Sequence, residues 1–198
     1  AKADLRDGFW GVPVEYLSRK NLGIRHPTTG RLLRSARLPF GYNRSPEHFC
    51  ELTESVAEKL RLRAALAKTS TGASFHVFVF VDDYLIIGDD KEAAELGMKM
   101  LQELLDELGI QVSPWKWRGP TQAIEFLGIF MSNVPGQRKI GLSEGRRGDV
   151  VALIDAWCES HPRPDAGPLR VDPTELASLL GTLVFASQVV PGGRTYLP

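Results

Sequence analysis

The feature that most constrains this chain is an apolar run from Phe75 to Gly88, interrupted once by two adjacent carboxylates, Asp82 and Asp83. Both arms are rich in β-branched and aromatic residues, which predicts a β-hairpin with the acidic pair at a two-residue turn. Aspartate is common in turns, so an ordinary hairpin is one interpretation. Like charges held together between buried strands repel each other unless a cation offsets the repulsion, so the other interpretation is a metal site.

A second acidic segment lies near the start of the chain, where Asp4 and Asp7 flank Leu5 and Arg6. The residues around it predict another strand end that carries a carboxylate. Two strand ends of this kind, brought together by the fold, would give the convergent oxygen ligands that a hard cation requires. The second segment therefore favours the metal interpretation of the acidic turn.

Composition limits the class of protein. The chain has 198 residues, of which 43% are hydrophobic and 24% charged, as expected for one compact domain or a domain with a small appendage. The two cysteines and four histidines lack zinc-like spacing. We find no membrane-spanning stretch and no signal peptide, and we expect a soluble, intracellular protein without a membrane partner; nucleus and cytoplasm are not distinguished.

Charge distribution says more than net charge. The net charge is zero and the isoelectric point is near 7.1, which by itself argues against nucleic-acid binding. Residues 18–44, however, contain basic side chains and no acidic ones. A solvated charged face is one interpretation, and a surface that contacts phosphates is the other. The predicted nucleic-acid contacts are Arg25, Arg31, Arg34, Arg37 and Arg44.

Hydrophobic spacing predicts the elements of the first part of the chain. Residues 23–26 and 31–34 form an expected hairpin, and Ser45 is an expected N-cap of a helix that reaches about residue 66. Asp90 is expected to cap a second helix, which ends before Gly109. The order of strand, helix, hairpin, helix and strand predicts an α+β fold of the split βαβ, ferredoxin-like kind.

The last third of the chain changes character. Short strands are expected within residues 124–131 and 139–142, around a turn. Ser143 opens one expected helix, and Asp172 opens another beyond a linker at residues 161–168 that is rich in proline and glycine. We expect a small helical appendage here.

Taken in order, these segments resemble the palm of reverse transcriptases. Residues 4–9 resemble the first catalytic motif of that family, residues 38–46 the second, and residues 80–83 the aromatic-X-Asp-Asp third. Leu108-Gly109 with Lys116 resembles the fourth motif, and residues 125–128 resemble the fifth, the primer grip. Five collinear matches over about residues 1 to 130 are specific in combination.

The resemblance implies an organisation and a subtype. It implies a palm over residues 1–142 that includes partial fingers at about residues 15–40, and a helical, thumb- or connection-like segment over residues 143–198. The similarity is to retrotransposon enzymes, of the DIRS-like tyrosine-recombinase type or the LTR type. Only three residues precede Asp4, so we expect the fingers and RNase H regions to belong to other parts of a parent polyprotein.

By the same resemblance the chain is an RNA-directed DNA polymerase that extends a DNA primer on an RNA template with dNTPs. The chemistry is nucleotidyl transfer assisted by two Mg²⁺ ions, with Mn²⁺ as a substitute. The implied metal ligands are Asp4, Asp82 and the carbonyl of Leu5, with Asp83 in support. Oxygen ligands of this kind suit Mg²⁺ better than zinc.

The remaining implied roles concern substrate. Lys116 matches the lysine that protonates the departing pyrophosphate, although a surface lysine between two tryptophans is an alternative. Phe9 matches the steric gate that rejects a 2′-hydroxyl. The implied nucleotide-binding residues are Asp7, Gly8, Phe9, Phe40 and Gly41, and the implied primer grip is Phe126, Leu127 and Gly128.

Two other functions fit parts of the sequence. A catalytically inactive, domesticated module that binds RNA or supports assembly would explain the missing fingers and the zero net charge. A DNA-templated or primase-like polymerase would explain the carboxylates but fits the second and fifth motifs less well.

Overall fold

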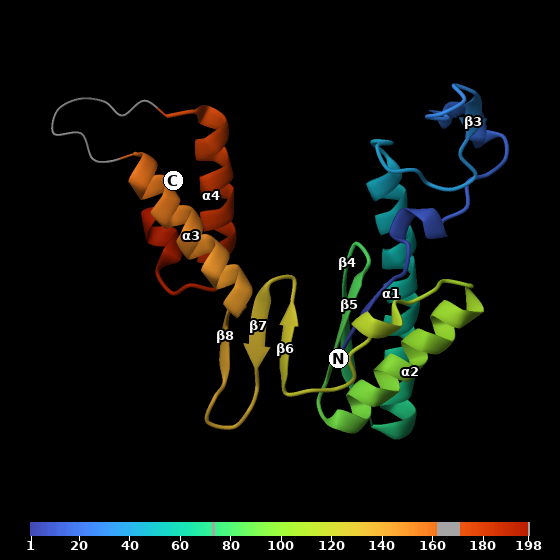
Figure 1. Cartoon of the computed structure of the whole chain (residues 1–198). Helices are drawn as coiled ribbons and strands as arrows, with labels where there is room; N and C mark the ends of the chain where they lie inside the picture. The colour runs from blue at the N-terminus through green and yellow to red at the C-terminus, as the bar shows by residue number, and fades with distance from the viewer. Residues whose placement is uncertain (73, 162–170, 198) are drawn as a thin grey trace. The chain divides into compact units, whose positions relative to one another are not determined.

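The computed structural model describes residues 1–72, 74–161 and 171–197 (Figure 1). They divide into two compact units, Ala1–Thr121 and Gln122–Pro198, and each unit is described by itself. The sequence placed a boundary after Leu142. The strands within residues 123–142 belong to the second unit, because they form a sheet with one another and not with the strands of the first unit.

The first unit is built on an antiparallel sheet of three strands, in the order β1 (Lys2–Asp4), β5 (Asp83–Gly88) and β4 (Phe75–Phe80). Both outer strands run antiparallel to β5, so they are parallel to each other. The long helix α1 (Ser45–Thr71) lies between β1 and β4 in the chain. A parallel strand pair with a third strand inserted between its members is a split βαβ arrangement, which confirms the predicted α+β fold.

Helices α1 and α2 (Lys91–Glu107) cover one face of this sheet. Tyr84 of β5 is fully buried, and its hydroxyl donates to the Thr53 carbonyl of α1 at 2.9 Å. Burial raises the pKa of the Tyr84 phenol. Gly97 of α2 packs against the same face, beside the side chains of Phe75 and Ile86. The main core therefore lies between the sheet and the two helices.

The members of this core come from every element of the split βαβ arrangement. The larger buried side chains are Leu5, Leu38, Phe49, Val56, Leu60, Phe75, Val77, Tyr84, Ile86, Met98, Leu101, Leu104 and Leu105. On the other face of the sheet, Phe78, Phe80 and Ile87 remain exposed.

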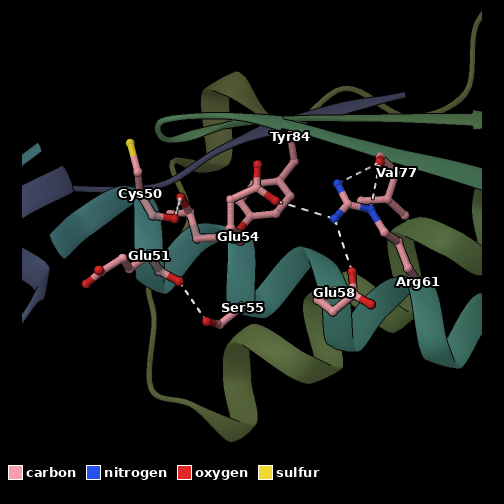
Figure 2. Close-up of polar contacts among 9 residues, drawn as sticks. Cys50, Glu51, Glu54, Ser55, Glu58, Arg61, Val77 and Tyr84 are labelled. Atoms are coloured by element: carbon pink, nitrogen blue, oxygen red, sulfur yellow. Dashed lines mark hydrogen bonds and ion pairs between the residues drawn. The ribbon is translucent and has the colours of Figure 1, made fainter. Parts of the chain in front are cut away.

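Arg61 of α1 ties the helix to the outer strand β4 (Figure 2). Its Nε and Nη2 atoms donate to the Val77 carbonyl at 3.4 and 3.3 Å. Its Nη1 atom lies 3.4 Å from the carboxylates of both Glu54 and Glu58. The guanidinium thus satisfies a carbonyl of the strand at the sheet edge, where β4 pairs with no further strand among the described residues.

Helix boundaries agree with the sequence where a side chain caps the backbone. Asp90 caps α2, because its Oδ1 atom accepts from the Ala93 N–H at 2.7 Å, as predicted. The prediction for Ser45 was wrong, because this residue lies inside α1 and its hydroxyl donates to the Pro39 carbonyl at 2.8 Å. The helix also continues to Thr71, beyond the predicted end near residue 66.

The strand expected after α2, at residues 110–112, is reduced to an isolated bridge between Val112 and Leu5, the residue that follows β1. A further isolated bridge joins Arg118 to Lys2 of β1. The predicted hairpin forms as β2 (Gly23–Arg25) and β3 (Leu32–Arg34), which are exposed throughout. The first unit also contains short 3₁₀ helices η1 (Gly8–Gly11), η2 (Ser18–Asn21) and η3 (Pro114–Lys116).

The second unit opens with an antiparallel meander of β6 (Ala123–Phe126), β7 (Ile129–Ser132) and β8 (Lys139–Leu142). The strand predicted at residues 124–131 is thus divided in two, because the chain turns back at Leu127 and Gly128. Helices α3 (Glu144–Ser160) and α4 (Pro173–Ser187) follow, and η4 (Gly193–Tyr196) lies near the end.

The two helix starts in this unit confirm the predicted caps. The Ser143 hydroxyl accepts from the Arg146 N–H at 3.4 Å, and Asp172 Oδ1 accepts from the N–H groups of Thr174 and Glu175. Beyond His161, the predicted linker lies outside the described residues. Within the described ranges, every helix is too short or too polar to cross a membrane.

Candidate active site

The acidic residues of the sequence meet where β1 ends and β5 begins. Asp4, the last residue of β1, is paired directly with Asp83, the first residue of β5. Directly opposed residues of an antiparallel pair point to the same face, so these two carboxylates lie side by side. The Leu5 N–H donates to the Asp82 carbonyl at 3.0 Å, which holds the hairpin turn against the end of β1. One oxygen from each of the three carboxylates lies within 4.8 Å of the others.

The turn itself differs from the prediction by one residue. Strand β4 ends at Phe80, the turn consists of Val81 and Asp82, and Asp83 already belongs to β5. Val81 has φ +57°, an uncommon conformation for a β-branched residue. The shifted turn gives the two aspartates different positions, with Asp82 at the tip and Asp83 in the sheet beside Asp4.

The electrostatics of the cluster show an excess of negative charge. The pKa of Asp83 rises from 3.8 to about 6, first because the side chain is partly buried. The charges of Asp4 and Asp82 and a hydrogen bond with Asp4 raise this pKa further, and Lys2 lowers it. A group of carboxylates that repel one another in this way is suited to bind a cation.

Lys116 supplies a positive charge to the same cluster. Its Nζ atom donates to Asp4 Oδ2 at 2.8 Å. This hydrogen bond is the main cause of the raised pKa of Lys116, and the negative charge of all three aspartates adds to it. The Asp4 side chain is only 12% exposed, whereas the Lys116 side chain is 54% exposed.

A cleft of about 450 Å³ opens beside the carboxylates. Most of the predicted nucleotide-binding residues line it, but Gly41 does not. The complete lining is Asp4, Leu5, Arg6, Asp7, Gly8, Phe9, Phe40, Phe49, Val81, Asp82, Ser113, Trp115 and Lys116. The cleft therefore brings together Asp4, Asp82, Lys116 and most of the predicted nucleotide-binding residues, while Asp83 lies beside Asp4 outside the lining.

Aromatic side chains form one wall of the cleft. The Phe9 ring lies between Phe40, at a centroid distance of 5.2 Å, and Phe49, at 5.3 Å. Phe49 belongs to the buried core, so it supports Phe9 from behind, while Phe40 is 67% exposed. Gly41 has φ +86°, a conformation that glycine adopts without strain.

Several lining residues were not predicted to be functional. Arg6 stands inside the first motif, and Trp115 directly precedes Lys116, so their positions in the sequence were usable signals. For Phe49 the sequence pattern indicated only a position in the apolar stripe of α1. Val81 stands inside the third motif, between Phe80 and Asp82. Ser113 carried no signal, because only the backbone path brings it to the cleft.

The predicted nucleic-acid contacts lie outside this cleft. Three of them have partners within the chain. Arg25 and Arg37 donate to the carbonyls of Gly30 and Gly11 at 3.0 and 2.9 Å, and Arg44 donates twice to Glu47, at 3.0 and 3.2 Å. Arg31 and Arg34 are exposed on and beside the β2–β3 hairpin. Contact of these arginines with nucleic acid stays a prediction.

The predicted primer-grip residues belong to the second unit. Phe126 ends β6, and Leu127 and Gly128 form the tight turn to β7 with φ +51° and +78°. The Gly128 carbonyl accepts from the Ser143 N–H at 2.9 Å, which joins this turn to the start of α3.

The donor set of the cluster fits a hard divalent cation. Carboxylate oxygens at the ends of two neighbouring strands are ligands that Mg²⁺ prefers. After burial, the charges of Asp4 and Asp82 raise the pKa of Asp83, and a cation held by the three carboxylates would offset this repulsion. The residues present therefore fit Mg²⁺.

The fold agrees with solved polymerase structures. The foamy viral protease-reverse transcriptase dRH in complex with double-stranded DNA is similar over 94% of this chain and 27% of that chain, with a TM-score of 0.68 and 20% identity. The foamy viral protease-reverse transcriptase in complex with an RNA/DNA hybrid gives a TM-score of 0.62 and 22% identity, over 94% of this chain and 21% of that chain. The chain thus has the reverse-transcriptase fold.

Sequence comparison defines the family. Residues 1–131 match the family described as reverse transcriptase (RNA-dependent DNA polymerase), and the chain belongs to this family. The Gag-Pro-Pol polyprotein of bovine leukemia virus (isolate Australian) is 30% identical over 130 residues, which are 63% of this chain and 9% of that polyprotein. Polyprotein P3 of Commelina yellow mottle virus is 26% identical over 128 residues, 65% of this chain and 6% of that polyprotein. The chain therefore spans a small part of these relatives.

Proposed function

We propose that this chain is the core of an RNA-directed DNA polymerase, which adds dNTPs to the 3′-hydroxyl of a primer. The observation that carries the proposal is the meeting of Asp4, Asp82 and Asp83 at one end of a cleft that Phe9 and Lys116 also line. Family membership supports the same reaction class.

The carboxylates have distinct parts in this proposal. Asp4 and Asp82 hold the metal, the Leu5 carbonyl adds an oxygen, and Asp83 supports the site from its position in the sheet. Two Mg²⁺ ions, for which Mn²⁺ can substitute, supply stabilisation of the attacking and leaving oxygens when they are bound. Asp83, beside Asp4, would add a third carboxylate oxygen to the cluster.

The cleft walls would select the substrate. Phe9 is held between Phe40 and Phe49, so its ring cannot easily move aside for a 2′-hydroxyl. This supports a preference for deoxynucleotides. Asp7 and Gly8 line the cleft and would adjoin the nucleotide there. Gly41 follows Phe40 of the lining and would approach the nucleotide through its backbone. Lys116 is charged and within reach of the cleft, which supports a part in protonating the leaving group.

The family and the fold support nucleic-acid partners for this chain. An RNA template and a DNA primer would run past the arginines of residues 25–44, which lie in the segment proposed as partial fingers. Phe126, Leu127 and Gly128 would grip the primer, and residues 143–198 would form a thumb- or connection-like part. Further fingers and RNase H regions would come from a retroelement polyprotein, because the chain spans only 9% of the bovine leukemia virus relative.

Primer extension on an RNA template with Mg²⁺ and dNTPs tests the proposal, both on the chain and on a parent polyprotein. We expect extension by the parent protein, and its loss when Asp82→Asn and Asp83→Asn are combined. Asp89→Asn is the matched control, because Asp89 is an exposed carboxylate that follows the same hairpin but does not line the cleft. Extension that survives the double substitution would refute the proposal. Template binding without extension would instead favour a non-enzymatic RNA-binding module.

A further inference from the structure

The Asp4 carboxylate is a binding partner for two cations, a metal ion and the Lys116 ammonium. Asp4 is the principal metal ligand of the proposed function, on which the present inference rests. The same side chain accepts a hydrogen bond from the Lys116 ammonium, 2.8 Å from Oδ2. Because the Asp4 side chain is only 12% exposed, little of its surface is left for a second cation while the ammonium stays in place.

The backbone that carries Lys116 is fixed beside β1 on both sides. The Ser113 N–H donates to the Asp4 carbonyl at 3.0 Å, and Arg118 and Lys2 exchange two hydrogen bonds of 2.9 Å. The lysine side chain between these anchors is 54% exposed. It can therefore leave Asp4 by rotation of its own bonds, while its α-carbon stays at the cleft.

The lysine has another place to go within the same cleft. Lys116 lines the cleft together with Phe9 and Asp82. An ammonium that is displaced from Asp4 stays tethered where a polyphosphate group would lie, and phosphate oxygens are acceptors that a lysine ammonium binds well. The positive charge that no longer pairs with Asp4 is then available to bind the phosphate groups of a substrate.

We propose that Lys116 is an internal cation that competes with the divalent metal for Asp4, so that metal binding releases the ammonium into the cleft. Lys116 then acts as a positioning residue for the metal site before it can act on a substrate. Two consequences follow. Removal of the ammonium strengthens metal binding, and addition of metal makes the ammonium more accessible.

Binding of Mn²⁺ alone, measured by the electron paramagnetic resonance signal of the free ion, tests the first consequence. We expect Lys116→Met to lower the dissociation constant by roughly fivefold, as expected for an ion pair with one exposed partner. Lys116→Arg should stay near the wild type because it keeps the charge. Lys91→Met is the control for loss of one positive charge, since Lys91 is 71% exposed on α2 and pairs with Glu95. Unchanged or weaker Mn²⁺ binding by a folded Lys116→Met protein would overturn the proposal.

Amine labelling of the unmutated chain tests the second consequence without any variant. A reagent that acetylates lysines, followed by peptide mass spectrometry, should modify Lys116 several times faster after Mn²⁺ is added, with Lys91 as the internal reference. An unchanged Lys116 rate at saturating Mn²⁺ would contradict the release. Both readouts are independent of polymerisation. Absence of primer extension would therefore count against the proposed function, whereas Mn²⁺ binding and Lys116 acetylation alone decide whether Lys116 and the metal compete for Asp4.

Discussion

The Nζ atom of Lys116 lies 2.8 Å from Oδ2 of Asp4, although 112 positions separate the two residues in the chain. The contact joins the end of β1 to η3, and two backbone hydrogen bonds between Lys2 and Arg118 extend the same junction. A nearly buried carboxylate therefore has a cationic neighbour whose backbone is held beside the same strand. The charge balance of this cluster leads to the first prediction.

Asp83→Asn should raise the thermal unfolding temperature of the chain at pH 8 in EDTA and leave it unchanged at pH 3.5. The folded-state pKa of Asp83 is about 6, above its ordinary value of 3.8. Below pH 3.8 the group is protonated in both states and has no effect. Between pH 3.8 and 6 the Asp83 carboxyl releases its proton mainly in the unfolded chain, so the unfolded state gains stability as pH rises. Above pH 6 this loss of folding stability has reached its full size.

Calorimetry or circular dichroism at a series of pH values measures this effect. The Asp89→Asn control should show the wild-type pH profile, since Asp89 is exposed and outside the cluster. Added Mg²⁺ should reduce the advantage of Asp83→Asn, because the cation also offsets the repulsion. A substitution that destabilises at pH 8 would show that the charge repulsion is not dominant.

Phe9→Ala should allow ribonucleotides to be incorporated, while Phe9→Tyr should keep the preference for deoxynucleotides. The reason is steric, because the ring is held between Phe40 and Phe49 at centroid distances of 5.2 and 5.3 Å. The ratio of kcat/KM for dNTP and rNTP, measured with an active parent protein, reports the change. An unaltered ratio in Phe9→Ala would remove Phe9 from sugar selection.

Gly97→Ala should destabilise the first unit. A β-carbon at Gly97 would lie 2.8 Å from Cγ2 of Ile86 and 2.9 Å from Cδ2 of Phe75, too close for either side chain to stay in place. Overpacking of this kind costs about 1–3 kcal/mol, which exceeds the gain of about 1 kcal/mol from the better helix propensity of alanine.

Chemical denaturation measures the change in the free energy of unfolding. Gly181→Ala in α4 is the matched control, because no atom of the described residues outside its own helix lies within 4 Å of the added β-carbon. This substitution should be neutral or stabilising. If both substitutions stabilise the chain, the packing of α2 on the sheet is looser than described.

Tyr84→Phe should lower the free energy of unfolding by about 1 kcal/mol, the usual net contribution of one hydrogen bond. The Tyr84 hydroxyl is fully buried and donates to the Thr53 carbonyl of α1 at 2.9 Å. The substitution keeps the ring and its packing. Tyr16→Phe is the control, since Tyr16 is 73% exposed. Equal stability of both variants would show that this hydrogen bond contributes nothing net.

Local signals in the sequence were reliable where a short-range interaction decides the structure. Asp90, Ser143 and Asp172 cap the helices they were expected to cap, because a side-chain oxygen and the next backbone N–H groups are all within one turn. The two hairpins followed from alternating apolar runs and their turns. The predicted N-cap at Ser45 was wrong because a distant partner, the Pro39 carbonyl, takes the hydroxyl.

The sequence by itself determined that two acidic segments would each lie at the end of a strand, since the pattern of apolar and acidic residues sets which positions can be buried. Only the tertiary structure decided that Asp83 opposes Asp4 in register, that Val81 takes the turn position next to Asp82, and that Lys116 reaches Asp4. Register and long-range contacts depend on how α1 and α2 pack on the sheet. That packing is a sum of many weak contacts between residues far apart in the chain, and no single stretch of sequence contains it.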